Sequence, residues 1–445
     1  MQAKILELIN QKKMVEARDE LLKLNVVDIA LFFVELDRDN LVSCFRILPK
    51  DIAAEVFSYI DSDVQRLIVD AILDNEIRTI INNSFLDDTV DFLEEMPANV
   101  VRRVLSNTDE NTRKLINEFL SYPEDSAGSI MTIEYVSLKE GMTVQQALKY
   151  IKENGTDKET INNCYVLDEF RTLKGVVTIR KLILSDEDDF IKNIMSDKFI
   201  SVNTFDDQEE IAFRFKKYDL LSMPVVDKEQ KLVGIVTIDD IIDVIDIEVT
   251  EDIQKMAAMA PSEVPYLKTK TIKLVRNRIW WLLFLMISAT FSGMIINKYD
   301  EILSSYIILA AFIPVIMDTG GNSGSQSSTL IIRSMALGEI KTSDFFRVVW
   351  KEARVSLLAG GILSVVNFLR VYFIEKTSLA IAAVVSLTLM VTVMLSKIIG
   401  GALPIIAKIF KVDPAIMAGP LITTIVDVMA LSIYFGLASL FLGIT

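Results

Sequence analysis

Between Ile279 and Ile296 the chain reads IWWLLFLMISATFSGMII and carries no charged side chain. A helix rises about 1.5 Å per residue, so it needs about 20 apolar residues to cross about 30 Å of hydrocarbon. The run therefore predicts a membrane-spanning helix. A single run of this kind could also be a helix buried in a protein core, so the rest of the chain decides between the two interpretations.

Four further apolar runs follow. They cover Ile302–Met317, Val355–Leu369, Thr377–Ser396 with a continuation through Lys397 to about Ile406, and Ala415–Gly443. Five such runs close together predict a five-helix α-helical transmembrane domain over residues 277–445. An odd number of spans places the two ends of the chain on opposite sides of the membrane.

Basic residues are distributed unevenly over the loops between these runs. One side has Lys268, Lys270, Lys273, Arg276, Arg278, Arg333, Lys341, Arg347, Lys351, Arg354, Lys408 and Lys411, and the other has Lys298, Arg370 and Lys376. Short cytoplasmic loops carry an excess of Lys and Arg. We therefore expect a multi-pass protein of the cell membrane with a cytoplasmic N-terminus and an external C-terminus.

Charge divides the chain at the same place. Residues 1–269 contain 31 Lys and Arg against 52 Asp and Glu, whereas residues 270–445 contain 15 against 9. Such an acidic half repels phosphate, which excludes a nucleic-acid partner and favours cations. The chain has no histidine and no CxxC pair, and Cys44 and Cys164 are 120 residues apart, so a disulfide framework is not expected. Any metal site should therefore use oxygen ligands.

Residues 1–127 contain a helical repeat with a spacing of 48 residues. Leu48-Pro49 followed by Val56-Phe57-Ser58 returns as Met96-Pro97 followed by Val104-Leu105-Ser106. Proline is tolerated where a helix begins, because the first amides of a helix have no partner within it. The repeat predicts a small helical solenoid, an architecture that usually provides interaction surfaces.

A different repeat fills residues 128–250. Ile130-Met131-Thr132 returns as Ile194-Met195-Ser196, and the stretch 175–179 returns as 234–238. Each copy is expected to run strand, helix, strand, turn, strand, helix. The pair resembles tandem CBS domains, α/β regulatory modules that often bind adenine nucleotides.

CBS domains that bind nucleotides carry a Gly-h-x-Thr-x-x-Asp pattern, in which h is an apolar residue. The second copy matches this pattern with Gly234, Thr237 and Asp240. The first copy has Lys181 where the acid should stand, so ATP is expected at the second copy if at either. The alternative is that the glycine and the threonine only pack the strand and end it.

Two acidic groups stand out in the first half. One is Asp87, Asp88, Asp91, Glu94 and Glu95, and the other is Asp239, Asp240, Asp243, Asp246, Glu248, Glu251 and Asp252. Like charges within one helical turn repel. If the two groups face each other, divalent cations would bridge them, so we expect these carboxylates to sense intracellular divalent cations. The alternative is a solvated helix face.

The membrane half contains a glycine-rich stretch, Thr319–Ser328, that reads TGGNSGSQSS. Irregular backbone at membrane depth survives only where protein buries it or where it lines a water-filled path. We expect this stretch to follow the second span as an irregular segment whose carbonyls approach a pore. No Gly-Lys-Ser/Thr follows, so ATP hydrolysis is not indicated.

A single acid, Asp427, stands among apolar residues in the last run. It comes 14 residues after Asp413, about 21 Å away along an unbroken helix. Intramembrane acids are functional candidates by default, and the alternative is an internal ion pair with Lys397 or Arg370. Mg²⁺ suits one or two carboxylates plus water better than Ca²⁺, which needs six to eight oxygens. A homodimer would supply two such carboxylates on its two-fold axis.

These motifs together resemble the MgtE family of magnesium transporters over nearly the whole chain. The matching stretches are Leu48-Pro49-Lys50, Ala53-Ala54-Glu55, Ala127–Thr132, Pro224–Asp227, Thr250–Ile253, Thr319–Asn322 with Gln326-Ser327, Asp413-Pro414-Ala415 and Gly419-Pro420. The resemblance implies a homodimeric, channel-like Mg²⁺ carrier whose pore acid is Asp427. It also implies a plug helix over about Glu251–Arg276 that closes the pore when cytosolic Mg²⁺ is high.

The resemblance places sensor ligands at Glu55, Asp87, Asp91, Asp219, Asp240, Glu248, Glu251 and Asp252. We add Asp243 and Asp413 as candidate metal ligands. The candidate pore lining comprises Gly320, Gly321, Asn322, Thr423 and Asp427.

We therefore interpret the chain as a Mg²⁺-selective, channel-like uptake protein that is gated by cytosolic Mg²⁺. Two alternatives are a Co²⁺ or broad divalent-cation transporter and a membrane Mg²⁺ sensor that conducts nothing. An enzyme is not expected, since the sequence offers no activated nucleophile.

Overall fold

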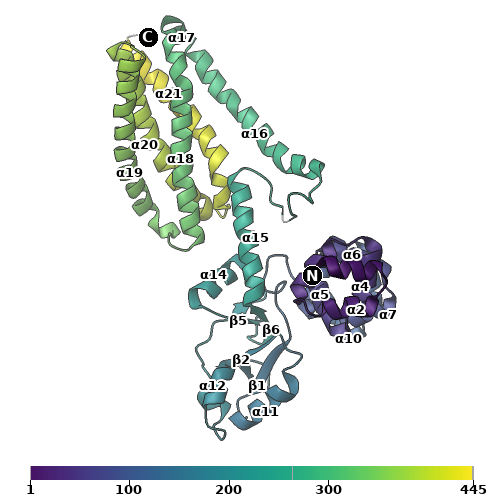
Figure 1. Cartoon of the computed structure of the whole chain (residues 1–445). Coiled ribbons are helices and arrows are strands. Elements are labelled where there is room, and N and C mark those ends of the chain that lie inside the picture. The colour runs from purple at the N-terminus through teal and green to yellow at the C-terminus, as the bar shows by residue number, and fades with distance from the viewer. Residues whose placement is uncertain (1, 263, 443–445) are drawn as a thin grey trace. The chain divides into compact units, whose positions relative to one another are not determined.

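The computed structural model describes residues 2–262 and 264–442. The chain divides into two compact units, residues 1–244 and residues 245–445, which are described separately (Figure 1). The described part of the first unit begins with ten short helices, and two small sheets with further helices follow. The described part of the second unit contains five helices that are long and apolar enough to cross a membrane.

Short helices with one continuous apolar core make up the beginning of the first unit. They are α1 (Gln2–Asn10), α2 (Met14–Leu21), α3 (Val26–Val34), α4 (Arg38–Ile47), α5 (Lys50–Ser58), α6 (Ser62–Ala71), α7 (Asp74–Ile81), α8 (Leu86–Glu94), α9 (Ala98–Asn107) and α10 (Glu110–Phe119). Pro49 and Pro97 are the N-cap residues of α5 and α9, as the repeat predicts. Phe57 and Phe92 meet edge to face in the core, with ring centroids 5.1 Å apart. The predicted helical N-terminal domain is confirmed.

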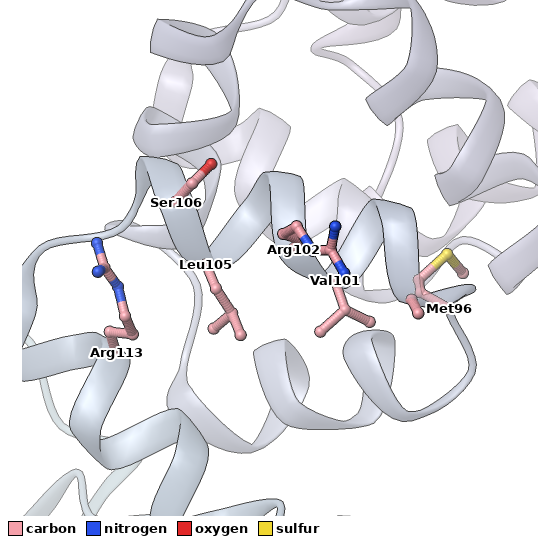
Figure 2. A pocket seen from close by; sticks show the side chains of 7 residues that line it. Met96, Val101, Arg102, Leu105, Ser106 and Arg113 are labelled. Carbon is pink, nitrogen blue, oxygen red and sulfur yellow. The ribbon is translucent and has the colours of Figure 1, made fainter.

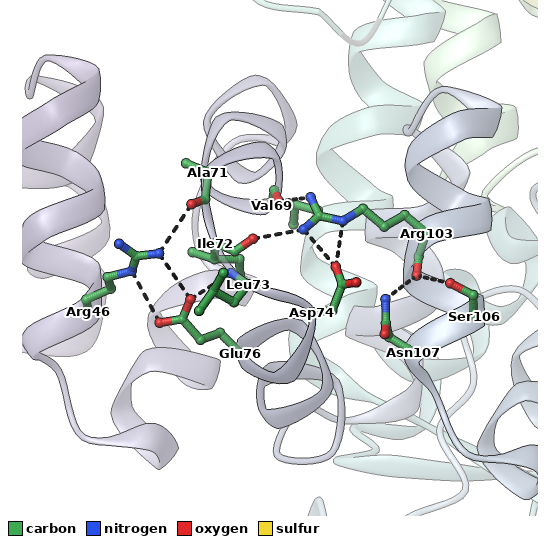
Figure 3. Close-up of polar contacts among 10 residues, drawn as sticks. All are labelled: Arg46, Val69, Ala71, Ile72, Leu73, Asp74, Glu76, Arg103, Ser106 and Asn107. Carbon is green, nitrogen blue, oxygen red and sulfur yellow. Dashed lines mark hydrogen bonds and ion pairs between the residues drawn. The ribbon is translucent and has the colours of Figure 1, made fainter.

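One arginine ties three of these helices together (Figure 3). Arg103 of α9 donates hydrogen bonds to Oδ1 of Asp74 at 2.9 Å and to the carbonyl oxygens of Val69 and Ile72 at 2.6 and 2.8 Å. The last carbonyls of α6 have no partner within their own helix. Arg103 therefore satisfies groups that would otherwise stay unpaired, and it fixes the stacking of the repeat.

Two α/β copies follow the helical domain, and their last helix runs on from the first unit into the second. The first copy contains β1 (Tyr135–Lys139), α11 (Val144–Asn154), β2 (Thr160–Leu167), β3 (Leu173–Thr178) and α12 (Ile179–Leu184); the second copy contains α13 (Ile191–Ile194), β4 (Val202–Asn203), α14 (Gln208–Tyr218), β5 (Ser222–Val226), β6 (Leu232–Thr237) and α15 (Ile238–Met256). Each sheet has one parallel pair and one antiparallel pair of strands. This order is the predicted one, and the tandem CBS architecture is confirmed.

Glycine is required at the same place in both copies because another backbone passes close by. A Cβ atom on Gly234 would lie 2.8 Å from the carbonyl oxygen of Thr132, and one on Gly175 would lie 2.9 Å from that of Ser196. Single antiparallel bridges join Thr132 to Ile235 and Val176 to Ser196 at these points. The repeated Ile-Met-Thr/Ser motifs therefore pack against the repeated glycines.

The link between the CBS pair and the membrane helices differs from the prediction. We expected one plug helix over about Glu251–Arg276, but α15 continues from the second copy to Met256, and the next helix begins only at Thr271. Pro261 and Pro265 lie between the two helices, and proline cannot supply the amide that a helix interior needs. The charged end of the predicted plug therefore belongs to the last turns of α15.

The second unit continues with the membrane helices. They are α16 (Thr271–Lys298), α17 (Asp300–Ser305), the 3-10 turn η1 (Ile307–Phe312), α18 (Ile313–Ala336), η2 (Thr342–Asp344), α19 (Phe345–Leu369) with the π-helical turn η3 (Arg370–Ile374), α20 (Leu379–Ile409), η4 (Pro414–Met417) and α21 (Gly419–Leu442). The five-helix membrane domain is confirmed. α16 meets the bundle at its C-terminal end, where Tyr299 stacks on Phe435 with ring centroids 4.9 Å apart (Figure 1).

The bounds of several spans differ from those expected. α18 begins near the end of the run Ile302–Met317 and continues to Ala336, and α19 starts ten residues before Val355. The fourth span does run on past Lys397, to Ile409. Gly443, where the fifth run was expected to end, lies outside the described residues.

The prediction of an irregular segment at Thr319–Ser328 is wrong, because the whole stretch is helical within α18. Its glycines provide close contact between helices instead. A Cβ on Gly400 of α20 would lie 2.2 Å from the carbonyl oxygen of Gly324, and one on Gly324 would lie 2.6 Å from Ile422 of α21. Small residues allow membrane helices to approach closely, while helical hydrogen bonding satisfies the backbone.

The expected unbroken helix from Asp413 to Asp427 is also interrupted. Asp413 caps η4 by accepting a hydrogen bond from the amide of Ala415 at 2.8 Å. Ala418 is extended, and Gly419 has a φ of +40°, a value that L side chains rarely adopt. The chain therefore turns before α21 begins.

Candidate cation sites

Asp427 is a partly buried carboxylate in the middle of α21. No Lys or Arg among residues 2–262 and 264–442 lies within 4.0 Å of its oxygens. The carboxylate of Asp318, an exposed residue of α18, is close enough to repel the Asp427 carboxylate. Two acids from neighbouring helices therefore face the same region without a compensating base.

The two cations considered as partners of Asp427 bind elsewhere. Lys397 donates to Oε1 of Gln326 at 3.3 Å and lies 3.5 Å from the carbonyl oxygen of Ser323. Arg370 donates to Asn367 at 3.0 Å and pairs with Glu375 at 3.5 Å. The alternative of an internal ion pair is therefore not seen in this structure.

The predicted pore-lining residues of α18 and α21 partly come together. A Cβ on Gly321 would lie 2.8 Å from Cγ2 of Thr423, and one on Gly320 would lie 2.8 Å from Val426, the neighbour of Asp427. The Thr423 hydroxyl donates to the carbonyl oxygen of Pro420 at 2.8 Å, so it is engaged within its own helix. Asn322 is exposed.

A buried acid of the membrane unit escaped the sequence analysis. Glu352 of α19 is buried and accepts a hydrogen bond from the Ser327 hydroxyl at 2.6 Å. Its side chain also packs against Gly401 of α20. Glu352 lies among the basic residues before the third apolar run, which led us to treat that segment as a loop. Its spacing from Val348 and Ser356, one helical turn on each side, is the signal that could have revealed a buried face.

The acidic groups of the first unit do approach each other. Burial, the Asp88 carboxylate and the Asp240 carboxylate raise the pKa of Asp87 well above its usual range. Burial and then Asp240 raise the pKa of Asp91 to about 7, although its side chain remains exposed to solvent on one side. Burial, partly offset by the hydrogen bond from Thr237, raises the pKa of Asp240 to about 6. Acids of α8 and α15 therefore share one electrostatic environment.

Glu159 and Glu134 also belong to this environment, and the sequence analysis missed both. Burial, followed by Asp239, Asp240 and Asp88, raises the pKa of Glu159 to about 7. Glu134 accepts hydrogen bonds from the Thr132 hydroxyl and the amide of Ile133. Glu134 stands alone in sequence and Glu159 follows a mixed pair, Asp157 and Lys158, so neither belongs to an acidic run like those that define the two acidic groups.

The remaining predicted sensor residues are less closely gathered. Glu55 and Asp243 are exposed, and Asp219 ends α14 in a left-handed conformation with a φ of 51°. Burial raises the pKa of the Tyr59 hydroxyl, and the negative charges of Glu55, Asp88 and Asp239 raise it further. Within the described ranges, no three acidic side chains converge closely enough to form a complete metal site.

A further charged cluster joins α15 to the loop before α21 within the second unit. Nζ of Lys255 lies 2.6 Å from Oδ2 of Asp413 and 2.6 Å from Oε1 of Glu251. Burial opposes the charge on Lys255, but these two carboxylates raise its pKa above the usual range. Burial, followed by Asp413 and Glu248, raises the pKa of Asp252 to about 6. Three predicted metal ligands, Glu251, Asp252 and Asp413, thus lie near one lysine, and the fourth, Glu248, acts electrostatically on Asp252.

The residues of the nucleotide pattern have structural roles. Gly234 allows the close approach of Thr132, and the Thr237 hydroxyl donates to Oδ2 of Asp240 at 2.7 Å. In the first copy, Thr178 caps α12 by accepting a hydrogen bond from the amide of Lys181. The packing role considered for Gly and Thr is therefore present.

A groove of about 620 Å³ lies along α9 of the helical domain (Figure 2). It is lined by Met96, Ala98, Val101, Arg102, Leu105, Ser106 and Arg113. Its charged residues are both arginines, so it repels a divalent cation.

Three family models match the chain. Residues 313–437 match the MgtE divalent cation transporter model, residues 24–125 match the MgtE intracellular N domain, and residues 127–187 and 191–247 match the CBS domain. The chain is therefore a multi-pass membrane protein of the class that transports divalent cations.

Relatives extend the match to nearly the whole chain. The magnesium transporter MgtE of Thermus thermophilus is 36% identical over 429 residues, covering 96% of this chain and 95% of its own. That of Bacillus subtilis is 32% identical over 439 residues, covering 99% and 97%. The chain belongs to the MgtE family of magnesium transporters.

Solved structures agree for the first unit. The soluble part of a magnesium transporter is 33% identical, with a TM-score of 0.53 and coverage of 56% of this chain and 97% of its own. The cytosolic domain of the Mg²⁺ channel MgtE in complex with ATP is 35% identical, with a TM-score of 0.53 and coverage of 55% and 100%.

Proposed function

We propose that this chain is a Mg²⁺-selective, channel-like uptake protein whose conduction depends on Asp427. The observation that carries the proposal is an intramembrane carboxylate without a basic partner among the described residues, facing a second acid, Asp318. A carboxylate at membrane depth is costly unless water or a cation accompanies it. Mg²⁺ keeps most of its water and needs only one or two carboxylates, so it fits this donor set.

Asp427 acts in a homodimer in this proposal. One Asp427 carboxylate per chain gives a weak site, whereas a two-fold axis along α21 would bring the two Asp427 carboxylates of a dimer to one hydrated ion. The N-terminus faces the cytoplasm and the C-terminus faces outward, as the positions of Lys and Arg favour. An inside-negative membrane potential then drives Mg²⁺ inward without ATP hydrolysis.

Cytosolic Mg²⁺ closes the channel by binding the acidic cluster of the first unit. The carboxyl groups of Asp87, Asp91 and Asp240, together with Glu159, hold protons unusually well because burial and mutual repulsion disfavour their charged forms. A bound divalent cation would offset the same free-energy cost of keeping these carboxylates charged, close together and buried. Binding should therefore favour the compact arrangement of the helical and CBS domains over an open one. Glu55, Asp219 and Asp243 would join as ligands only after a further rearrangement.

The end of α15 transmits closure to the membrane helices. Glu251 and Asp413 meet at Lys255, and Asp252, on which Glu248 and Asp413 both act, lies nearby. Asp413 precedes the short turn η4 that leads into α21. Mg²⁺ at these acids would hold the end of α15 against the segment that positions Asp427. ATP is a second regulator, bound near Gly234, Thr237 and Asp240, which accords with the ATP complex of the related cytosolic domain.

Recordings from the full-length protein in planar bilayers test conduction and gating together. We expect an inward Mg²⁺ current when the cytosolic face is free of Mg²⁺ and loss of that current at millimolar Mg²⁺ on this face. A non-conducting sensor would give no current under either condition. Equal currents with Co²⁺ would favour the broad divalent-cation alternative. We assign no enzymatic activity to the chain.

A further inference from the structure

The first turns of α19 have two faces of opposite character. Val348, Glu352 and Ser356 are buried and follow one another at intervals of four residues. Arg347, Trp350, Lys351 and Arg354 are exposed and share the opposite face, at positions i, i+3, i+4 and i+7. We call these four residues the basic stripe.

The basic stripe lies where the span enters the membrane surface. The stretch from Val355 to Leu369 carries no charged side chain, and with the π-helical turn that follows, which begins at Arg370 and ends at Ile374, it is about 30 Å long at about 1.5 Å per residue. This length matches the hydrocarbon thickness, with Arg370 near the far end. The ten residues before Val355 extend about 15 Å further. The stripe therefore stands at the level of the lipid headgroups.

Of the three cations in the basic stripe, Arg347 has an acidic partner among the described residues, whereas Lys351 and Arg354 have none. Arg347 pairs with Asp344 at 3.1 Å, but within the described ranges no acid lies within 4.0 Å of Lys351 or Arg354. The Arg354 guanidinium lies 5.9 Å from the centre of the Trp350 ring, and the indole is 65% exposed. A tryptophan beside guanidinium and ammonium groups suits the boundary between lipid tails and charged headgroups.

A topological signal alone does not explain this arrangement. The positive-inside bias requires only that cations are present near the end of a span, not that they share one face with an exposed indole. Arginine and lysine on a common face bind phosphate oxygens, while the indole packs against acyl chains. An acidic protein segment could also bind these cations, but it would make no use of an indole that lies at the level of the lipid. The indole therefore favours a lipid as the ligand.

We propose that Arg347, Trp350, Lys351 and Arg354 form a binding site for the phosphate headgroup of an anionic phospholipid. Because α19 carries Glu352 on its opposite face, hydrogen-bonded to Ser327 of the glycine-rich helix α18, bound lipid would also support the packing of that helix.

Native mass spectrometry of the full-length protein in a nonionic detergent tests the proposal. Phosphatidylglycerol and phosphatidylcholine would be titrated separately against the wild type and against the Arg347→Gln, Lys351→Gln, Arg354→Gln triple variant. The matched control removes three exposed cations at the ends of other spans on the same side of the membrane domain, as Lys341→Gln, Lys408→Gln, Lys411→Gln. A further arm adds excess inorganic phosphate.

We expect phosphatidylglycerol to bind the wild type more tightly than phosphatidylcholine and the stripe variant to lose at least about tenfold in this affinity. The control variant should keep it, and inorganic phosphate should not displace the lipid. Equal losses in both triple variants would overturn the proposal in favour of general charge attraction. Displacement by inorganic phosphate would overturn the assignment to lipid.

Two single variants keep the test decisive if the triple variant does not fold. Trp350→Leu keeps every charge and Arg354→Gln removes one. Each should weaken phosphatidylglycerol binding about threefold. Unchanged binding in both would contradict the proposal.

Discussion

Lys255 and Asp413 form an ion pair in which Nζ lies 2.6 Å from Oδ2. The pair joins the end of α15 to the segment that precedes α21, the helix that carries Asp427. Because Glu251 lies equally close to the same ammonium group, Lys255 is the centre of an otherwise acidic cluster.

Lys255→Gln should make closure depend more strongly on Mg²⁺. Without the ammonium group, Asp413, Glu251 and Asp252 repel one another, so the end of α15 is held only when a cation replaces the lysine. We expect higher current in the absence of cytosolic Mg²⁺ and a steeper fall as Mg²⁺ is added. Lys255→Arg keeps the charge and serves as the control. Identical Mg²⁺ dependence in the wild type and the Gln variant would exclude this role.

The acidic cluster of the first unit should make stability depend on pH. The folded-state pKa values of Asp91 and Glu159 are about 7 and those of Asp88 and Asp240 about 6, all above the values of unfolded carboxyl groups. Between about pH 4 and pH 7 the folded state therefore binds more protons, so stability falls as pH rises through this window.

Thermal unfolding of the full-length protein in detergent, followed in Mg²⁺-free buffer from pH 5 to pH 8, measures this effect. We expect the highest midpoint at the acidic end, and addition of Mg²⁺ should restore stability mainly at pH 8. The apparent affinity for Mg²⁺ should weaken as pH falls, since protons and Mg²⁺ compete for the same oxygens. A Mg²⁺ effect that is independent of pH would contradict a shared site.

Gly400→Ala should destabilise the membrane domain. A Cβ at this position would lie 2.2 Å from the Gly324 carbonyl oxygen, so α18 and α20 would have to move apart. We expect a loss of ~1–3 kcal/mol in unfolding free energy, measured by denaturant titration in mixed micelles. Gly361→Ala is the control, because nothing lies within 4 Å of its added Cβ. Equal stability of the two variants would show that the close helix contact is not needed.

Glu352→Ala should cost ~1–3 kcal/mol as well, because it leaves the Ser327 hydroxyl without its buried partner. Glu352→Gln can still accept the hydrogen bond and should cost less. The same unfolding measurement distinguishes the two. If both variants lost the same stability, the carboxylate charge rather than the hydrogen bond would be what matters at this position.

Periodicity and composition predicted the helical repeat and the five spans, because each buries apolar side chains at a regular interval. The CBS pair was predicted from a second internal repeat and its resemblance to a known module. They failed where packing between helices decides the backbone. TGGNSGSQSS was expected to be irregular, yet in a lipid environment a helix satisfies its backbone and glycine lets α20 and α21 approach it. The proline-containing link after Met256 was mistaken for helix because the resemblance was extended across it.

The candidate sites were predictable only where acids cluster in sequence. Asp427 stood out because an apolar run surrounds it, and Asp87 and Asp240 because they lie in charge runs. Glu159, Glu134 and Glu352 lie outside the acidic runs, and only the fold brings Glu159 and Glu134 to the acidic cluster and Glu352 to Ser327. The role of Lys255 could not be predicted either, since its partner Asp413 lies 158 residues away.

Mg²⁺ uptake into proteoliposomes under an inside-negative potential, compared between the wild type and Asp427→Asn, tests the central claim most directly. Asp300→Asn removes the same charge from an exposed position on the membrane unit and serves as the control. The account predicts that Asp427→Asn abolishes most of the uptake while Asp300→Asn retains it, with both variants folded. Uptake by Asp427→Asn at the wild-type rate would contradict a conducting role for this carboxylate.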